Sequence, residues 1–141
     1  DGGDVMMVGD HFYVGRSART NEEGIRQFSE ILAKYGMTCS EVTLEKVLHL
    51  KTGVNYIENN NMLVTETMNK EEAFKGFNRF VVDADELYAV NSLNINSTVL
   101  VPAGYPKTQK IIEDLGYPVI LMDTNEFRLI DGSLTCLSLR F

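Results

Sequence analysis

The feature that most constrains the fold is a pattern of two short apolar runs, a helical stretch and a further apolar run, which occurs three times. In the first copy, Gly9-Asp10 is a two-residue hairpin signal between two strands. Asn21 is a good N-cap for an amphipathic helix that Gly36 ends. The strands of this copy are predicted at residues 4–8, 11–15 and 38–44. The predicted unit is therefore ββαβ.

The second and third copies follow the same order with little residue identity. The second has strands predicted at 53–57, 62–65 and 80–83, with a weak helical stretch at 71–74. The third has strands predicted at 92–95, 98–101 and 119–122, with a helix that starts after Pro106, runs through Leu115 and stops at Gly116. Such repetition indicates an α/β repeat architecture, and no linker divides the chain into separate domains.

Composition excludes several classes of function. The 141 residues are one domain's length, and a net charge of −7 argues against a nucleic-acid partner but suits a small cationic substrate. No apolar run approaches the ~20 residues needed to cross a membrane, so we expect no membrane partner. Cys39 and Cys136 give neither a disulfide framework nor a metal-ligand spacing. We expect a reduced, cytoplasmic protein without a metal or cofactor.

The C-terminal residues contain the first candidate for chemistry. Asp131-Gly132 is a turn signal, and the apolar residues at 137, 139 and 141 alternate with polar ones, which predicts a closing strand. Cys136 is then expected near the start of that strand, with its sulfur at the rim of a cleft. The alternative is a small buried hydrophobic residue, which a free cysteine usually is.

A histidine is the second candidate. His49 lies between two leucines and before Lys51-Thr52-Gly53, as at the entrance of a strand. Histidine is the usual proton carrier near neutral pH, and a carboxylate such as Asp1 can orient its ring. The alternative is a partly buried structural histidine, and His11 is expected to be structural.

Four motifs together resemble a known family. They occur in this order: Asp1-Gly2-Gly3-Asp4-Val5, the stretch 12–21 (FYVGRSARTN), Leu48-His49-Leu50-Lys51-Thr52, and the stretch 130–136 (IDGSLTC). In type and spacing they resemble the dimethylarginine dimethylaminohydrolases of the guanidine-modifying (pentein) superfamily. The resemblance runs along the whole chain but covers only the C-terminal part of the family's domain.

The resemblance implies a five-bladed α/β propeller of ββαβ units and a set of site residues. It implies that Cys136 is the nucleophile, that His49 is the general acid and base, and that Asp1 partners the histidine. It also implies that substrate is bound by Arg19, which would hold the α-carboxylate, and by Ile130 with the adjacent Asp131, where a backbone carbonyl would receive the α-amino group.

Two basic residues bear on this interpretation. Arg16 is an alternative to Arg19, and a solvated charge is the alternative for either. Arginine deiminases and amidinotransferases commonly carry an aspartate two residues after the histidine, whereas this chain has Lys51 there, as dimethylargininases do. Lys51 is expected to point away from a guanidinium.

The resemblance also implies that residues 1–141 form a partial pentein domain of about three blades without its N-terminal blades. We expect a companion chain or a second copy to complete the propeller. The function implied is hydrolysis of N-methylated arginine to citrulline and a methylamine. The alternatives are an arginine deiminase, or an inactive pentein fragment that acts as a binding or interaction module.

Overall fold

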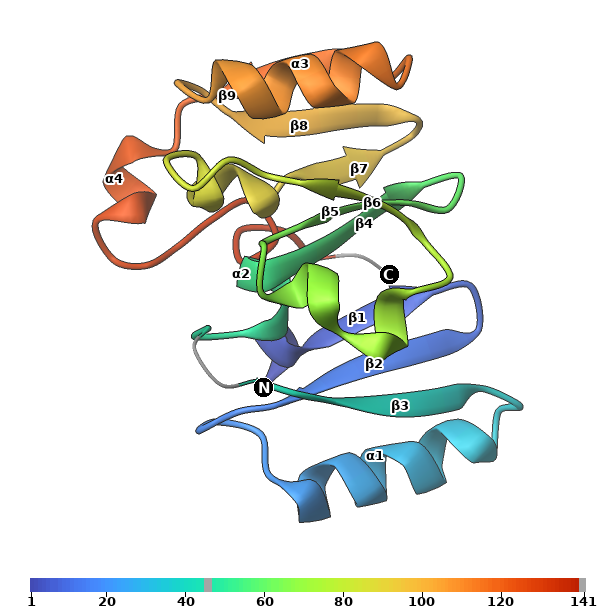
Figure 1. Ribbon diagram of the computed structural model, residues 1–141. Coiled ribbons are helices and arrows are strands. Elements are labelled where there is room, and N and C mark those ends of the chain that lie inside the picture. The colour runs from blue at the N-terminus through green and yellow to red at the C-terminus, as the bar shows by residue number, and fades with distance from the viewer. Residues whose placement is uncertain (45–46, 140–141) are drawn as a thin grey trace. The chain divides into compact units, whose positions relative to one another are not determined.

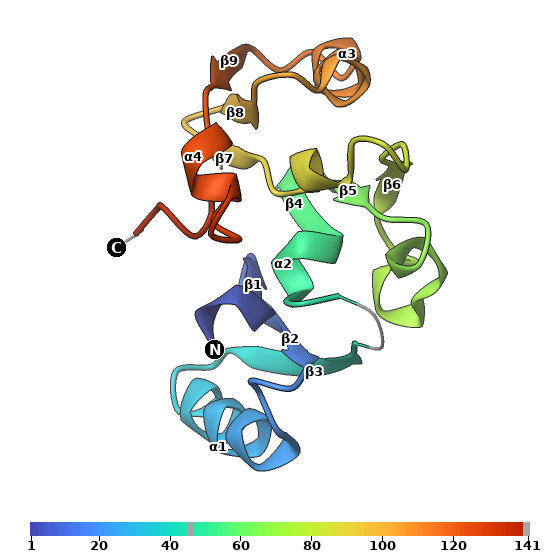
Figure 2. The ribbon, with the colours of Figure 1, turned by 90° about the vertical axis from the view of Figure 1, so that its left-hand side faces the viewer.

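The computed structural model describes residues 1–44 and 47–139, and the chain forms two compact units, Asp1–Thr52 and Gly53–Phe141. Among the described residues there are three three-stranded sheets, ordered β1-β2-β3, β4-β5-β6 and β7-β8-β9 (Figures 1 and 2). In each sheet the first two strands are antiparallel and the third is parallel to the second. The predicted ββαβ repeat is confirmed.

The first unit contains one complete copy of the repeat. Its elements are η1 (Gly2–Asp4), β1 (Val5–Val8), β2 (His11–Arg16), α1 (Glu22–Ala33), β3 (Thr38–Thr43) and the beginning of α2 (Leu50–Gly53). Gly9 has a φ of +57° in the β1–β2 turn, a conformation that glycine adopts without steric cost. The Asn21 side chain accepts a hydrogen bond from the Gly24 amide at 2.8 Å, which caps α1 as predicted.

Helix α1 packs mainly against β3 and to a lesser extent against β2. Ile25 and Leu32 are buried on the helix, and Val14 and Val42 are buried on the strands. Ile31 and Tyr35 repeat at the same three- and four-residue steps in the sequence, but they are 51% and 74% exposed. The buried stripe of α1 is therefore narrower than its apolar pattern.

The second unit contains the other two copies. Its elements are β4 (Val54–Glu58), β5 (Asn61–Val64), the 3-10 helices η2 (Met68–Lys70) and η3 (Glu72–Phe74), β6 (Asn78–Val81), η4 (Leu87–Val90), β7 (Leu93–Ile95), β8 (Thr98–Pro102), α3 (Pro106–Asp114), β9 (Val119–Met122) and α4 (Asn125–Arg128). The weak helical stretch predicted at 71–74 contains the 3-10 helix η3, directly after η2, in place of an α-helix.

Two hairpin turns in this unit need left-handed backbone. Asn59 and Asn60 have φ values of 52° and 64°, and Asn96 and Ser97 have values of 50° and 60°. Positive φ at both central residues is typical of type I′ turns, whose twist matches that of paired strands. Asparagine tolerates this conformation better than most residues, which explains the turn signals in the sequence.

The core of the second unit joins both of its sheets. Eight residues form it: Ile57, Leu63, Val82, Val90, Val99, Val101, Ile112 and Tyr117. The Tyr117 hydroxyl donates a 2.9 Å hydrogen bond to the backbone carbonyl of Glu58 and accepts one from the Asn61 amide group. These bonds satisfy the polar end of an otherwise buried ring and fix the β4–β5 turn.

The prediction of a closing strand after Cys136 is wrong for the described residues. Residues 134–137 form a turn, in which the Leu137 amide donates to the carbonyls of Ser133 (3.1 Å) and Leu134 (3.2 Å). Leu137 and Leu139 are 50% and 85% exposed, so their alternation with polar residues does not reflect one buried face. Arg140 and Phe141, the last residues of the predicted strand, lie outside the described residues.

Candidate active site

In the first unit, one buried carboxylate joins three turns. Asp4 is completely buried at the end of η1. Its Oδ2 accepts hydrogen bonds from the hydroxyls of Ser17 (2.7 Å) and Thr20 (2.6 Å), and its Oδ1 accepts one from the Leu50 amide (3.0 Å). The turns that contain Asp1, Arg19 and His49 therefore meet at Asp4.

His49 lies immediately before α2, which leads into β4, so it is one helical turn away from the strand entrance that the sequence predicted. Its carbonyl accepts a 2.7 Å hydrogen bond from the Thr52 hydroxyl, and its side chain is 13% exposed. The ring packs on the backbone of Gly3, where an added Cβ would be 2.6 Å from the His49 Cγ. Glycine is therefore needed at this position for the ring to lie as it does.

Asp1, Arg19 and His49 come together at a single ring nitrogen. The Nε2 of His49 is 3.2 Å from Nη1 of Arg19 and 3.4 Å from Oδ2 of Asp1. Arginine is always a donor, so its contact uses the lone pair of a neutral imidazole, whereas a carboxylate is a partner for an N–H. The arrangement offers Nε2 a partner in either protonation state.

The surroundings of His49 favour its neutral form. Burial lowers its pKa most, and the Asp4 carboxylate acts against this by raising the pKa. Arg19, the α-amino group of Asp1 and Lys51 lower the pKa further. A neutral imidazole at neutral pH is suited to accept a proton.

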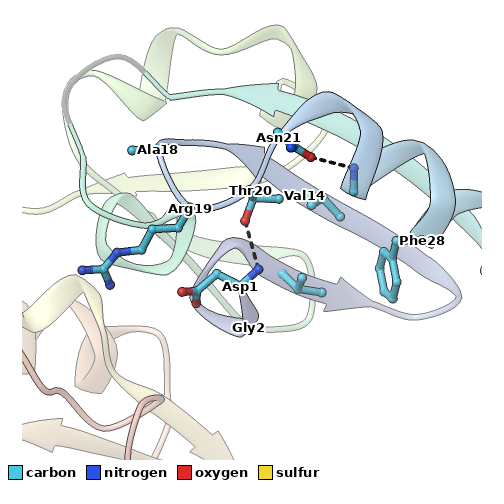
Figure 3. A pocket seen from close by; sticks show the side chains of 10 residues that line it. Asp1, Gly2, Val14, Ala18, Arg19, Thr20, Asn21 and Phe28 are labelled. Carbon is cyan, nitrogen blue, oxygen red and sulfur yellow. Dashed lines mark hydrogen bonds between the residues drawn. The ribbon is translucent and has the colours of Figure 1, made fainter.

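A cavity of about 440 Å³ lies beside these residues, between the β1–β2 pair and the start of α1 (Figure 3). Asp1, Arg19 and Thr20 line its polar part, and Val14 and Phe28 line its apolar part. The α-amino group of Asp1 donates to the Thr20 hydroxyl at 3.0 Å, while the side chains of Asp1 and Arg19 extend away from α1. Its size and mixed lining suit a small molecule.

The two arginines considered for carboxylate binding lie in different surroundings. Arg16 forms a 2.9 Å salt bridge through Nε to Glu41 and donates to the Thr43 hydroxyl at 3.3 Å. Both partners are on β3, so Arg16 links β2 to β3 within the sheet. Arg19 is the arginine that contacts His49 and lines the cavity.

In the second unit, Cys136 is exposed on a turn held by Asn91. The Asn91 carbonyl accepts a hydrogen bond from the Ser133 hydroxyl at 3.3 Å, and its Oδ1 accepts one from the Thr135 amide at 3.0 Å. Ser133 and Leu134 are buried, so they anchor the turn and leave Cys136 at the surface. An exposed thiol on an anchored turn is accessible for reaction.

Ile130 and Asp131 lie in the turn that precedes this segment. Asp131 has a φ of 61°, which confirms the predicted turn, and Ile130 is 78% exposed. The next carbonyl, that of Gly132, accepts a 2.7 Å hydrogen bond from the Tyr88 hydroxyl. Tyr88 therefore fixes the backbone just after Ile130 and Asp131.

We predict that an amidine-bearing alkylating agent labels Cys136 faster than Cys39 at neutral pH. Cys39 lies on β3, and burial, with a smaller contribution from Glu41, raises the pKa of its thiol and lowers its thiolate fraction. Peptide mass spectrometry over a time course measures both rates. Faster labelling of Cys39 would contradict the assignment of Cys136 as the reactive thiol.

Sequence reasoning did not single out the residues that support the site. Asp4, Ser17 and Thr20 lie inside the quoted motifs, but their role depends on contacts between distant turns.

Among residues 1–44 and 47–139, no group of three or more His, Cys, Asp or Glu is arranged to hold a metal ion. None of the helices in those ranges is long and apolar enough to cross a membrane.

Solved structures with the same arrangement of elements define the class of fold. A dimethylarginine dimethylaminohydrolase from Pseudomonas aeruginosa, with a cysteine replaced by serine and citrulline bound, superposes with a TM-score of 0.96 at 52% identity. That match covers 99% of this chain and 55% of the other. An amidinotransferase from Microseira wollei has a TM-score of 0.83 at 19% identity, over 95% of this chain and 45% of its own, and shares the fold. The chain therefore has the α/β propeller fold of the guanidine-modifying (pentein) superfamily, in ββαβ units.

Curated sequences define the relationship more narrowly, although no protein-family model matches the chain. The Pseudomonas aeruginosa dimethylarginine dimethylaminohydrolase is 52% identical over 141 residues, which are 100% of this chain and 56% of that protein. The Streptomyces coelicolor enzyme of the same name is 36% identical over 140 residues, which are 99% of this chain and 54% of its own. The chain is thus a homologue of the dimethylarginine dimethylaminohydrolases, and it spans about half the length of the curated relatives it matches.

Proposed function

We propose that this chain carries the nucleophile and the acid–base histidine of an enzyme that hydrolyses N-methylated arginine to citrulline and a methylamine. The observation that carries the proposal is the 52% identity to a dimethylarginine dimethylaminohydrolase along the whole chain. A second solved structure supports it, a dimethylarginine dimethylaminohydrolase with a histidine replaced by glycine, as an adduct with S-methyl-L-thiocitrulline. The replaced histidine and the cysteine replaced in the citrulline complex are numbered as far apart as His49 and Cys136 are here.

In the proposed first step, the thiolate of Cys136 attacks the guanidinium carbon. Resonance makes that carbon a poor electrophile, so a strong nucleophile is needed, and a thiolate is the reactive form of cysteine. Neutral His49 first takes the proton that the Cys136 thiol gives up, and then passes it to the departing methylamine, because an amine anion is too basic to leave. A carbon–sulfur bond forms, the carbon–nitrogen bond to the methylamine breaks, and a covalent thiouronium remains on Cys136.

In the proposed second step, water replaces the sulfur. Neutral His49 takes a proton from water, and the resulting hydroxide attacks the same carbon. The carbon–sulfur bond breaks and Cys136 leaves as thiolate. The added hydroxyl group gives its proton to solvent, and citrulline is released. Asp1, which is 3.4 Å from Nε2 of His49, is placed to stabilise the imidazolium that forms.

Substrate binding is proposed to rely on Arg19, Ile130 and Asp131. A guanidinium can hold a carboxylate through two parallel hydrogen bonds, and Arg19 lines the cavity of the first unit. The exposed turn at Ile130 and Asp131 presents backbone carbonyls for an α-amino group. We further propose that a companion chain or second copy supplies the other blades of this partial domain. We also propose a cytoplasmic location, where a nucleophilic thiol stays reduced.

The products distinguish this function from its alternatives. A preparation of the chain, alone or with the remaining part of a pentein domain, is incubated with dimethylarginine and separately with arginine. The proposal predicts citrulline and dimethylamine in equal amounts from dimethylarginine. Citrulline and ammonia from arginine alone would identify an arginine deiminase, and binding without turnover would identify a binding module.

We predict that Arg19→Ala raises KM for methylarginine by about tenfold or more and has little effect on KM for an analogue that lacks the carboxylate. Loss of a charged hydrogen bond costs about 1.5–3 kcal/mol, mostly as weaker binding. Steady-state kinetics on both substrates measures the difference. The matched control is Arg16→Ala, which removes a salt bridge within the sheet and should leave the ratio of KM values unchanged. Equal losses on both substrates in Arg19→Ala would contradict the assignment.

A further inference from the structure

The buried carboxylate of Asp4 has no salt-bridge partner among the described residues, yet its hydrogen bonds are well satisfied. Both hydroxyls on Oδ2 and the amide on Oδ1 are donors, and an ionised carboxylate only accepts. Leaving a polar group buried is favourable only when it is hydrogen-bonded in this way. Three neutral donors therefore hold an acidic side chain inside the first unit.

The donors are the immediate neighbours of the candidate site residues. Ser17 and Thr20 flank the turn that carries Arg19, and Leu50 directly follows His49. Asp1 lies on the same short 3-10 turn as Asp4, where the Asp4 amide donates to the Asp1 carbonyl at 3.1 Å. Arg19 and His49 are thus each one residue away from a donor to Asp4, and Asp1 is three residues away from Asp4 itself.

We propose that Asp4 is a positioning residue whose two oxygens fix the turns of Asp1, Arg19 and His49 and whose charge supports the imidazolium form of His49. This deepens the proposed function, because it names what assembles the acid–base part of that site. Asp4 contacts no reacting atom in this role and acts through its neighbours.

The charges around His49 predict the direction in which its pKa changes when one of them is removed. A purely structural role of Asp4 predicts no such direction. The charged groups that face the ring are the carboxylates of Asp1 and Asp4, the guanidinium of Arg19, the ammonium of Lys51 and the α-amino group of Asp1. The Asp4 carboxylate raises the pKa of His49, whereas Arg19 lowers it. Removing one charge or the other should therefore move the pKa of His49 in opposite directions.

The test is an NMR titration of the imidazole of His49 in the full chain, with Asp4→Asn as the main variant. Asparagine has nearly the same shape, but it lacks the charge and one of the accepting oxygens. We expect the pKa of His49 to fall, and the NMR signal of the Leu50 amide proton to lose the chemical-shift change that a carboxylate acceptor causes. Arg19→Ala should raise the pKa of His49, and the exposed Asp10→Asn should leave it unchanged.

Ser17→Ala keeps the test decisive if Asp4→Asn does not fold. It removes one donor to Asp4 and the 3.0 Å acceptor of the Arg19 amide, but it leaves the Leu50 contact. We expect the Arg19 turn to loosen and the pKa of His49 to rise, with the Leu50 amide unchanged. An unchanged pKa of His49 in folded Asp4→Asn, or in Ser17→Ala where only that variant folds, would overturn the proposal and leave Asp4 a purely structural residue. Because the titration needs no turnover, its failure is separate from a failure of the proposed hydrolase activity.

Discussion

Replacement of Cys136 by serine should reduce citrulline formation from dimethylarginine by at least about a thousandfold in a preparation that is otherwise active. A serine hydroxyl is far less ionised than a thiol at neutral pH and a weaker nucleophile, so the covalent step would fail while the turn held by Asn91 is retained. Steady-state citrulline production measures the loss.

Cys39→Ser is the matched control for this substitution. Cys39 is half-buried on β3, and the same chemical change there should leave the rate within a few-fold of the parent. A Cys136→Ser protein that binds citrulline and keeps its thermal stability would show that only the reaction is lost. Retention of turnover in Cys136→Ser would remove the nucleophile from the account.

Gly3→Ala should reduce turnover by about a hundredfold. The added Cβ would lie 2.6 Å from Cγ and 2.8 Å from Nδ1 of His49, closer than atoms can approach, so the ring has to move. A displacement of about 1 Å in a catalytic group can cost about 10²-fold in rate. The expected loss is in kcat, with the NMR signals of His49 shifted.

Gly76→Ala is the control, because an added Cβ at Gly76 meets no atom within 4 Å. The same methyl group in open space should change neither kcat nor the signals of His49. Full activity in Gly3→Ala would mean that the histidine works from another position than the one it has against Gly3.

The fold could be predicted largely because its signals are local. Gly9-Asp10 and Asn96-Ser97 mark hairpins, since each requires a backbone conformation that few residues adopt. The N-cap at Asn21 and the stop at Gly36 are equally local. Alternation of apolar and polar residues near Leu137 has the same appearance in sequence, but there a contact with Asn91, far away in the chain, produces a turn. Local pattern could not distinguish the two cases.

The candidate site also has a part that the sequence could predict and a part that it could not. Asp1, Arg19 and His49 could be selected by motif, and the structure brings these three together in the first unit. The support that Asp4 gives them depends on a hydrogen bond to Leu50 across 46 positions of the chain, which no spacing rule predicts. Motif and residue type selected the candidate residues, and tertiary structure was needed to show what holds them.

In the proposed mechanism, Cys136 becomes covalently attached to the substrate carbon during turnover. Rapid acid quenching of a reaction with dimethylarginine, followed by peptide mass spectrometry, measures this directly. We predict a thiouronium adduct on the peptide that contains Cys136, formed before citrulline appears and absent from Cys136→Ser. Citrulline formation at the normal rate with no adduct on Cys136, or with the adduct on Cys39, would contradict it.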